Sequence, residues 1–217
     1  KQRPQPLPRR ASRLPSADVS GRIIGDTLEM QLHSPDGDQG YPGTLEVTIR
    51  FTFSRDLVLN IDMEAVSDQD TVVNLTNHCY FDLSGGADPW GSCCKFTPIS
   101  LRKTMKTPCL QVSLRRWRVR PLISGRKRPS DRTIGADCRQ LHHCNGYDHN
   151  FVLRNHGQLE PDARLFSPIT GISMVESTDL PGVQLYSGNF VDAPNGKRPY
   201  APHSGICLEG QYFPNAM

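Results

Sequence analysis

The segment LEVTIRFTF (residues 45–53) is the clearest indication of the fold class, because its side chains alternate between apolar and polar along its whole length. The apolar members stand at every second position: Leu45, Val47, Ile49, Phe51 and Phe53. Successive side chains of a β-strand point to opposite faces of the sheet, so this period puts all the apolar ones on one face. The stretch therefore predicts a strand with one face on a core and the other in water.

The same period continues on both sides of this stretch. Residues 28–32 carry alternating Leu, Met and Leu, and residues 57–65 carry an apolar side chain at each odd position. The intervening segments, SPDGDQGYPG at 34–43 and SRD at 54–56, are rich in turn residues. This order predicts antiparallel strands joined by turns.

Shorter strands are expected in the second half of the chain, at residues 151–153, 172–176, 183–186 and 206–208. The 217 residues include 18 Gly and 18 Pro, and no segment shows a convincing helical period. The predicted fold class is therefore all-β, a sandwich or barrel, in a single domain over residues 1–217.

Charge is distributed unevenly along the chain, although the net charge is only +3. Residues 1–22 hold six Lys and Arg against one Asp, and residues 101–132 hold eleven against one Asp, whereas the remainder holds 8 basic and 20 acidic residues. A nucleic-acid interface would rest on the two basic segments alone. They lack the aromatic residues of a stacking platform, with only Trp117 in the second. We therefore expect no nucleic-acid partner.

The seven cysteines form no CxxC pair, and an odd number suits a disulfide framework poorly. Reduced thiols are typical of an intracellular protein. No apolar run approaches the ~18 residues of a membrane-spanning helix, and residues 1–13 lack the apolar core of a secretion signal. The sequence therefore predicts a cytoplasmic protein without a membrane partner.

Polar clusters interrupt the expected strands at residues 74–83, 145–151, 181–190 and 203–211. Together they offer His78, suited to donate a proton, and Glu209, suited as a base when partly desolvated. Taken singly, His78 also fits a half-buried structural histidine, and Glu209 a strand end in water. Ser187 and Asn189 have the character of turn residues.

The sequence carries no metal-binding or nucleotide-binding motif. No H-E-x-x-H motif occurs. His142 and His143 precede Cys144, but adjacent side chains of a strand point in opposite directions. We therefore expect no metal site and no cofactor.

The polar clusters resemble ordered motifs of the aldose 1-epimerase (galactose mutarotase) family. Residues 34–43 are similar to its S-P-D-G-x-x-G-Y-P-G turn, and residues 73–83 to its V-N-L-T-N-H-x-Y-F-x-L stretch. Residues 145–151, 181–190 and 204–211 are similar to N-G-[FY]-D-H-N-F, P-G-V-Q-x-Y-[ST]-G-N-F and S-G-x-C-L-E-T-Q. Five motifs in the family's order make a specific match.

This resemblance implies a β-sandwich of the galactose-mutarotase type that interconverts the α- and β-anomers of hexoses such as galactose and glucose, without a cofactor. By motif match it implies that His78 protonates the ring oxygen while Glu209 takes the proton of the anomeric hydroxyl. The ring opens, the C1–C2 bond rotates, and closure gives the other anomer. Tyr80, Asp148 and Gln184 match positions that contact the substrate.

The resemblance covers residues 25–100 and 133–217. The family's first and last strands have no counterpart, so the sandwich is expected to be incomplete at both ends. Gly210 stands where the family usually has Thr beside the base.

Residues 1–22 and 101–132 remain unmatched. Read in another frame, the codons of residues 1–14 permit the family's H-G-G substrate contact, and those of residues 115–127 permit its D-F-R motif. We therefore expect these segments to be out-of-frame translations of family sequence, with genuine basic loops as the alternative.

Two further functions stay open at this point. A catalytically silent carbohydrate-binding relative is favoured by the loss of the H-G-G contact and opposed by the presence of both His78 and Glu209. A hexose-6-phosphate 1-epimerase would need a cationic phosphate site, and the acidic part of the chain supplies only 8 basic residues.

Overall fold

The computed structural model describes residues 19–86, 97–98, 103–104 and 139–214. The chain divides into two compact units, residues 1–75 and residues 76–217. The expectation of one domain over the whole chain stays a prediction. Most of the two segments expected to be out of frame lies outside the described residues.

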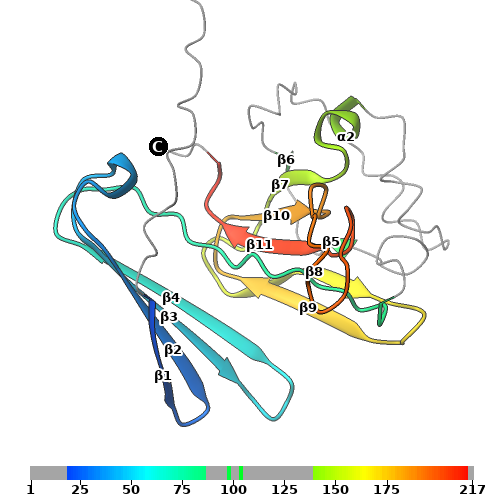
Figure 1. The fold of residues 1–217 in the computed structure, drawn as a ribbon, viewed down its shortest axis with the longest axis horizontal. Coiled ribbons are helices and arrows are strands. Elements are labelled where there is room, and N and C mark those ends of the chain that lie inside the picture. Colours follow the sequence, from blue (N-terminus) through cyan, green and yellow to red (C-terminus); the bar gives the residue numbers. More distant parts are fainter. Residues whose placement is uncertain (1–18, 87–96, 99–102, 105–138, 215–217) are drawn as a thin grey trace, which may run out of the picture. The chain divides into compact units, whose positions relative to one another are not determined.

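The first unit is a four-stranded antiparallel sheet in the order β1-β2-β3-β4 (Figure 1). Its elements are β1 (Val19–Ile24), β2 (Thr27–Ser34), the 3-10 helix η1 (Asp38–Gly40), β3 (Leu45–Phe53) and β4 (Leu59–Ser67). The register pairs Met30 with Ile49 and Ile49 with Met63, so apolar rows cross the sheet on one face. The strands expected from the alternation at 28–32 and 45–53 are thus present.

The turns of this sheet depend on a few specific residues. Leu57 was expected within a strand, but its φ of 63° belongs to the turn before β4, which Ser54 N closes by donating to Val58 O at 2.9 Å. Gly43 has a φ of 84°, and a Cβ there would meet Ser67 Oγ at 2.6 Å. Both features require glycine at that position.

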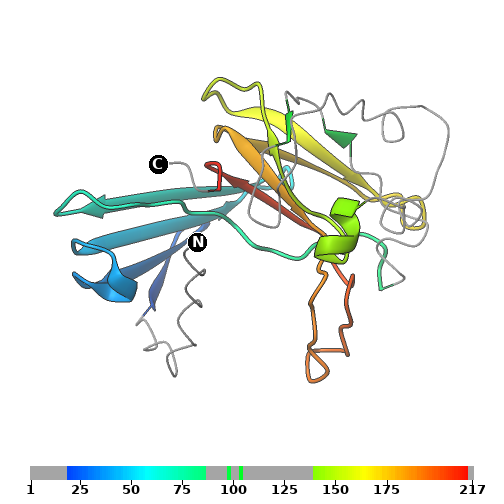
Figure 2. The same ribbon diagram turned by 90° about the horizontal axis from the view of Figure 1, so that it is seen from above.

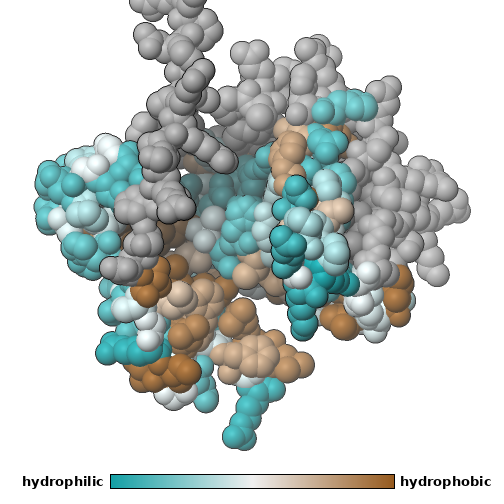
Figure 3. All heavy atoms as spheres, in the orientation of Figure 1, coloured by the Kyte–Doolittle hydropathy of each residue, from teal (hydrophilic) through white to brown (hydrophobic). Residues whose placement is uncertain are grey.

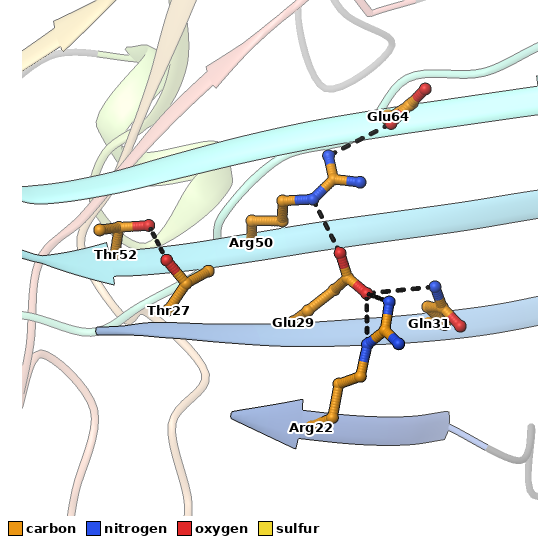
Figure 4. Close-up of polar contacts among 7 residues, drawn as sticks. All are labelled: Arg22, Thr27, Glu29, Gln31, Arg50, Thr52 and Glu64. Carbon is orange, nitrogen blue, oxygen red and sulfur yellow. Dashed lines mark hydrogen bonds and ion pairs between the residues drawn. The ribbon is translucent and has the colours of Figure 1, made fainter. Parts of the chain in front are cut away.

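A charge cluster on the polar face is centred on Glu29 (Figure 4). Arg22 of β1 donates to Glu29 Oε1 through Nε at 2.9 Å and through Nη2 at 2.7 Å. Arg50 of β3 donates through Nε to Glu29 Oε2 at 2.9 Å and reaches Glu64 with Nη1 at 3.2 Å. The hydrogen bonds from Arg22, and then those from Arg50, hold the pKa of Glu29 below its usual value.

The apolar face of the same sheet keeps several large side chains exposed, among them Ile23, Leu28, Phe53 and Leu59. Figure 3 shows apolar atoms gathered over these strands. Among the described apolar residues of this face, Val47 alone is buried.

The second unit contains two antiparallel sheets, β11-β10-β7-β6 and β5-β8-β9. Its elements are β5 (Thr97–Pro98), β6 (Lys103–Thr104), α2 (Arg139–Cys144), β7 (Asp148–Val152), β8 (Glu160–Phe166), β9 (Ser173–Thr178), β10 (Gly182–Tyr186) and β11 (Cys207–Gln211). One apolar cluster joins both sheets through Leu185 and Leu208 of the first and Leu165 of the second. Two sheets packed over a shared core form the predicted all-β sandwich.

Three elements differ from expectation. His142 and His143 lie on the short helix α2 rather than on a strand. β8 was not predicted, because its sequence EPDARLF contains Pro161 and the buried Asp162 and its register shifts between Pro161 and Ala163. Residues 74–83 place His78 among strand-like residues in the sequence, but they belong to no strand and contain the isolated bridge of Phe81 to Ile206.

A long excursion, residues 187–206, connects β10 to β11 and projects from that end of the sheet (Figure 2). Within the described residues, no helix is long and apolar enough to span a membrane.

Candidate active site

The candidate site lies on one face of the β7, β10 and β11 strands. The register aligns Tyr186 of β10 with both Asp148 of β7 and Cys207 of β11. Two residues away along β10, it aligns Gln184 with Glu209. Residues directly opposite on antiparallel strands share a face, so these side chains all point the same way. The intervening positions, among them Phe151, Val183, Leu185 and Leu208, form the core. The alternation thus gives this sheet a polar face and an apolar face.

His78 reaches this face from the segment that runs beside β11. Phe81 and Ile206 exchange both backbone hydrogen bonds, at 2.8 and 2.9 Å, and Thr76 Oγ1 donates to Gly210 O at 2.9 Å. Continuing that antiparallel register puts His78 opposite Glu209. Its Nε2 lies 3.6 Å from Glu209 Oε1, close enough for an ion pair and slightly long for a hydrogen bond.

These groups line a pocket of about 300 Å³, which is within the range of small-molecule sites. Its lining residues are His78, Tyr80, Asp148, Gln184, Tyr186, Phe190, Glu209, Gln211 and Pro214. The pocket therefore combines polar groups that can hydrogen-bond hydroxyls with aromatic rings that can pack against C–H groups.

Aromatic rings form one wall of the pocket. His78 stacks on Tyr80 with ring centroids 5.1 Å apart and meets Tyr186 edge-on at 5.8 Å. Tyr80 and Tyr186 contact each other edge-on at 6.2 Å. This packing fixes the plane of the imidazole, which is half exposed, while the carboxylate of Glu209 is nearly covered.

Asp148 and Gln184 form a second polar pair in the pocket. Gln184 Nε2 donates to Asp148 Oδ1 at 2.6 Å, which leaves the amide oxygen of Gln184 facing away. That oxygen is buried and has no hydrogen-bond partner among the described residues.

The electrostatics of the site favour a basic carboxylate. Burial raises the pKa of Glu209, the negative charge of Asp148 raises it further, and His78 opposes both effects. A carboxylate with a raised pKa takes up a proton more readily at neutral pH. Burial also raises the pKa of Tyr80, so its hydroxyl stays protonated and can donate a hydrogen bond.

A buried polar network holds the end of the site where Asp148 begins β7. Asn189 Nδ2 donates to Cys144 O at 2.7 Å and to Tyr147 O at 2.9 Å. Ser187 Oγ accepts a hydrogen bond from Tyr147 N at 2.8 Å. Ser187 and Asn189 were expected to be turn residues; Asn189 does lie in a turn, and both side chains are fully buried. Their role is to tie the start of the long excursion to β7.

The five side chains predicted for the site all line the same pocket: His78, Tyr80, Asp148, Gln184 and Glu209. Their individual roles stay predictions. Sequence reasoning missed Tyr186 and Gln211, although each stands two positions from a predicted residue on the same strand face. It also missed Phe190 and Pro214, which lie outside the strands and carry no such signal.

Two neighbouring residues are explained by their surroundings. His149 lies on the opposite face from the pocket, and burial lowers its pKa. Its Nδ1 accepts a hydrogen bond from Asp148 N at 2.9 Å, so it is a neutral structural histidine. At Gly210, a Cβ would meet Thr178 Oγ1 at 2.7 Å, so the hydroxyl of Thr178 takes the space beside the strand.

Among the described residues, one group could ligate a metal ion: His78, Cys207 and Glu209, whose donor atoms lie within 4.8 Å of one another. The three residues belong to the pocket or lie directly beneath it, so any ion there would meet the same groups that a ligand meets.

Curated relatives match most of this chain. The galactose mutarotases of Sus scrofa and Homo sapiens are each 33% identical to it over 203 residues, which is 90% of this chain and 57% of theirs. The aldose 1-epimerase of Escherichia coli is 29% identical over 194 residues, 85% of this chain and 54% of its own. The chain thus spans little more than half the length of the relatives it matches.

Solved structures share the fold. A GalM/aldose epimerase homologue from C. elegans superposes with a TM-score of 0.69 at 19% identity, over 90% of this chain and 58% of its own. A galactose 1-epimerase from Lactobacillus acidophilus gives 0.68 at 21% identity, over 91% of this chain and 58% of its own. The model of the family described as "Aldose 1-epimerase" matches this chain between residues 18 and 217. The chain therefore belongs to the aldose 1-epimerase family.

Proposed function

We propose that this chain carries the acid–base site of a mutarotase, which interconverts the α- and β-anomers of hexoses such as galactose and glucose. The observation that carries the proposal is the position of His78 opposite Glu209 at one pocket, with Nε2 and Oε1 3.6 Å apart. The names of the relatives, galactose mutarotase and aldose 1-epimerase, support the same activity.

In the proposed reaction, Glu209 takes the proton of the anomeric hydroxyl while His78 gives a proton to the ring oxygen. The C1–O5 bond breaks and C1 becomes an aldehyde. Rotation about C1–C2 presents the other face of the aldehyde, and ring closure with the two proton transfers reversed yields the other anomer. The raised pKa of Glu209 suits it to accept the first proton.

The other pocket residues have proposed binding roles. The Asp148–Gln184 pair offers the second carboxylate oxygen of Asp148 and the remaining amide N–H of Gln184 to sugar hydroxyls. Tyr80 and Tyr186 offer ring faces to the C–H groups of the sugar. Substrate positioning of this kind contributes to the rate because it holds the reacting groups in line.

A neutral hexose fits this pocket better than a hexose 6-phosphate. Among the described residues that line it, none is Lys or Arg. A phosphate group is normally bound by such side chains or by backbone N–H groups at a helix N-terminus. We therefore infer an unphosphorylated sugar as the substrate.

The test is NMR exchange spectroscopy of the anomers of galactose, glucose and their 6-phosphates in the presence of the full chain. We expect faster exchange with the free sugars, lost on His78→Asn by a factor of about 10²–10⁴. The matched control is His33→Asn, which removes the imidazole of an exposed His–Glu pair in the first unit. Binding of galactose without any acceleration would identify a silent carbohydrate-binding protein instead.

We also infer that the protein works in a reducing compartment such as the cytoplasm. Cys79 and Cys207 carry free thiols, and unpaired thiols are typical of such compartments. Alkylation tests this inference when the reagent is added as the cells are lysed in denaturant. We expect both cysteines to be recovered in alkylated form, which requires that they were reduced in the cell. Their recovery as disulfides would contradict it.

A further inference from the structure

Three side chains of different donor type converge at the pocket. They offer the imidazole of His78, the thiol of Cys207 and the carboxylate of Glu209, with donor atoms within 4.8 Å of one another. Nitrogen, sulfur and oxygen donors of this kind are the ligands of Zn²⁺ in proteins. A hard cation such as Mg²⁺ or Ca²⁺ would instead require a set of oxygen ligands.

The scaffold holds two of the three donors rigidly. Cys207 and Glu209 are two positions apart on β11, so their side chains share one face. β10 fixes the position of that strand through the pairs Tyr186–Cys207 and Gln184–Glu209. The pairing therefore fixes the backbone that carries both side chains, and all three donor atoms lie within 4.8 Å of one another.

His78 completes the set from the neighbouring segment. The bridge between Phe81 and Ile206 anchors that segment to the start of β11. Continuing the same register puts Tyr80 opposite Cys207, and the rings of His78, Tyr80 and Tyr186 pack together there. Cys207 is fully buried, so an ion entering from the pocket would meet Glu209 and His78 first and the thiol last.

The local charge favours a cation. Asp148 lines the same pocket as Glu209, and the described lining residues include no Lys or Arg that would repel a positive ion. Three protein ligands leave the fourth tetrahedral position of Zn²⁺ open to water. Binding through the thiol releases its proton to solvent and forms the sulfur–metal bond, so no other reactant is needed.

We propose that His78, Cys207 and Glu209 form a site for a thiophilic divalent cation of the Zn²⁺ class that excludes the sugar from the pocket. Exclusion follows because an ion held by His78 and Glu209 occupies the groups that are the acid and the base, and this part rests on the proposed function. The site is thus inhibitory rather than catalytic.

The binding arm of the test does not depend on turnover. Zn²⁺ is titrated into the full chain by calorimetry, and Co²⁺ is used as a spectroscopic probe because a thiolate ligand gives an intense charge-transfer band. We expect Cys207→Ala to remove that band and one binding event, with an affinity loss of at least about tenfold, since losing even an outer-shell partner costs 10–100-fold. Cys79→Ala is the matched control, because this exposed thiol is outside the donor set.

Comparison of Cys207→Ala with Cys79→Ala distinguishes Zn²⁺ binding at Cys207 from Zn²⁺ binding at an exposed thiol of the chain. Should Cys207→Ala perturb folding, His78→Asn offers an independent variant at a half-exposed side chain, and it should weaken Zn²⁺ binding as well. Unchanged Zn²⁺ binding in both variants overturns the proposal, as does binding of Ca²⁺ as tight as that of Zn²⁺.

The competition arm uses galactose as the second ligand. A saturating sugar concentration should weaken Zn²⁺ binding to the parent chain. Zn²⁺ should also slow anomer exchange, and its inhibition constant should rise by about tenfold or more in Cys207→Ala. Zn²⁺ binding through Cys207 in a chain that accelerates no exchange would leave the metal site standing and overturn the proposed function. Tight Zn²⁺ binding that galactose does not affect would overturn the exclusion.

Discussion

Glu29 and Glu209 are two buried glutamates on two antiparallel sheets of the same chain, and they are tuned in opposite directions. Their exposed fractions are similar, 5% and 7%. Glu29 is held by the guanidinium groups of Arg22 and Arg50, which lower its pKa. Glu209 faces His78 at 3.6 Å and the carboxylate of Asp148, and burial raises its pKa.

This difference shows that burial alone does not make a carboxylate reactive. A buried acid surrounded by arginines is satisfied, charged and inert, whereas one with a single half-exposed imidazole keeps the capacity to take up a proton. The first arrangement stabilises a sheet, and the second is suited to catalysis. The sheets differ in the same sense, because the strands around Glu209 cover a dry core and those around Glu29 leave apolar side chains exposed.

The largest expected effect separates the two glutamates by activity. Glu209→Gln keeps the shape of the side chain and removes the base, so we expect the rate of anomer exchange to fall by about 10²–10⁴-fold. Glu29→Gln should leave the rate at the level of the parent chain. Anomer exchange measured by NMR on both variants checks this, and an equal loss in the two variants would remove the distinction.

The next effect separates the two sheets by the depth of their cores. Leu185→Ala opens a cavity at a residue that is 1% exposed, so we expect a loss of about 2–5 kcal/mol in the free energy of unfolding. Ile23→Ala, at a residue that is 80% exposed, should change it by no more than about 0.5 kcal/mol. Urea unfolding followed by circular dichroism measures both. Similar losses would mean that the β1–β4 sheet is as well packed as the sandwich.

A smaller effect is expected in the network beside the pocket. Asn189→Ala removes the side-chain donor from the carbonyl groups of Cys144 and Tyr147, of which the second keeps the backbone N–H of Ser187 at 3.0 Å, so we expect a cost of about 1–3 kcal/mol. Since Asn189 acts by fixing the start of β7, KM for the sugar should rise more than kcat falls. Asn60→Ala, at an exposed position of β4, is the control. A change in kcat alone would argue against positioning.

Each of the two units contains a glutamate that makes the stability of the chain depend on pH, Glu176 in the sandwich and Glu29 in the β1–β4 sheet. The two effects have opposite signs. On the sandwich, burial and then Asp162 raise the pKa of Glu176 to about 9, so the folded chain keeps a proton that the unfolded chain releases above about 4.5. Stability should therefore fall as pH rises through this window, by up to ~1.4 kcal/mol per pH unit. The lowered pKa of Glu29 has the opposite effect, because its stabilisation is present above the unfolded pKa and is lost as pH falls.

Thermal melts from about pH 2 to about pH 10 test this pair of slopes, because the Glu29 window lies below its unfolded pKa of 4.5. Glu176→Gln should flatten the decline on the alkaline side, and Glu29→Gln should flatten the decline on the acid side. An unchanged alkaline slope in Glu176→Gln would show that Glu176 does not hold the proton.

The sequence predicted most of what depends on alternation and little of what depends on long-range packing. The period at residues 45–53 gave the strand and its apolar face, and the clusters around His78 and Glu209 gave the pocket. β8 was not predicted, because a proline, a buried acid and a register shift interrupt the alternation of apolar and polar residues in it. Ser187 and Asn189 escaped because their burial depends on α2 and β7, which are more than 30 residues away.

The most direct test of the opposite tuning is a carboxyl titration by ¹³C NMR on chain labelled at glutamate, with the two resonances assigned by Glu29→Gln and Glu209→Gln. We predict that Glu209 titrates above the usual glutamate range and Glu29 below it. A Glu209 resonance that titrates at or below that of Glu29 would contradict the assignment of Glu209 as the base.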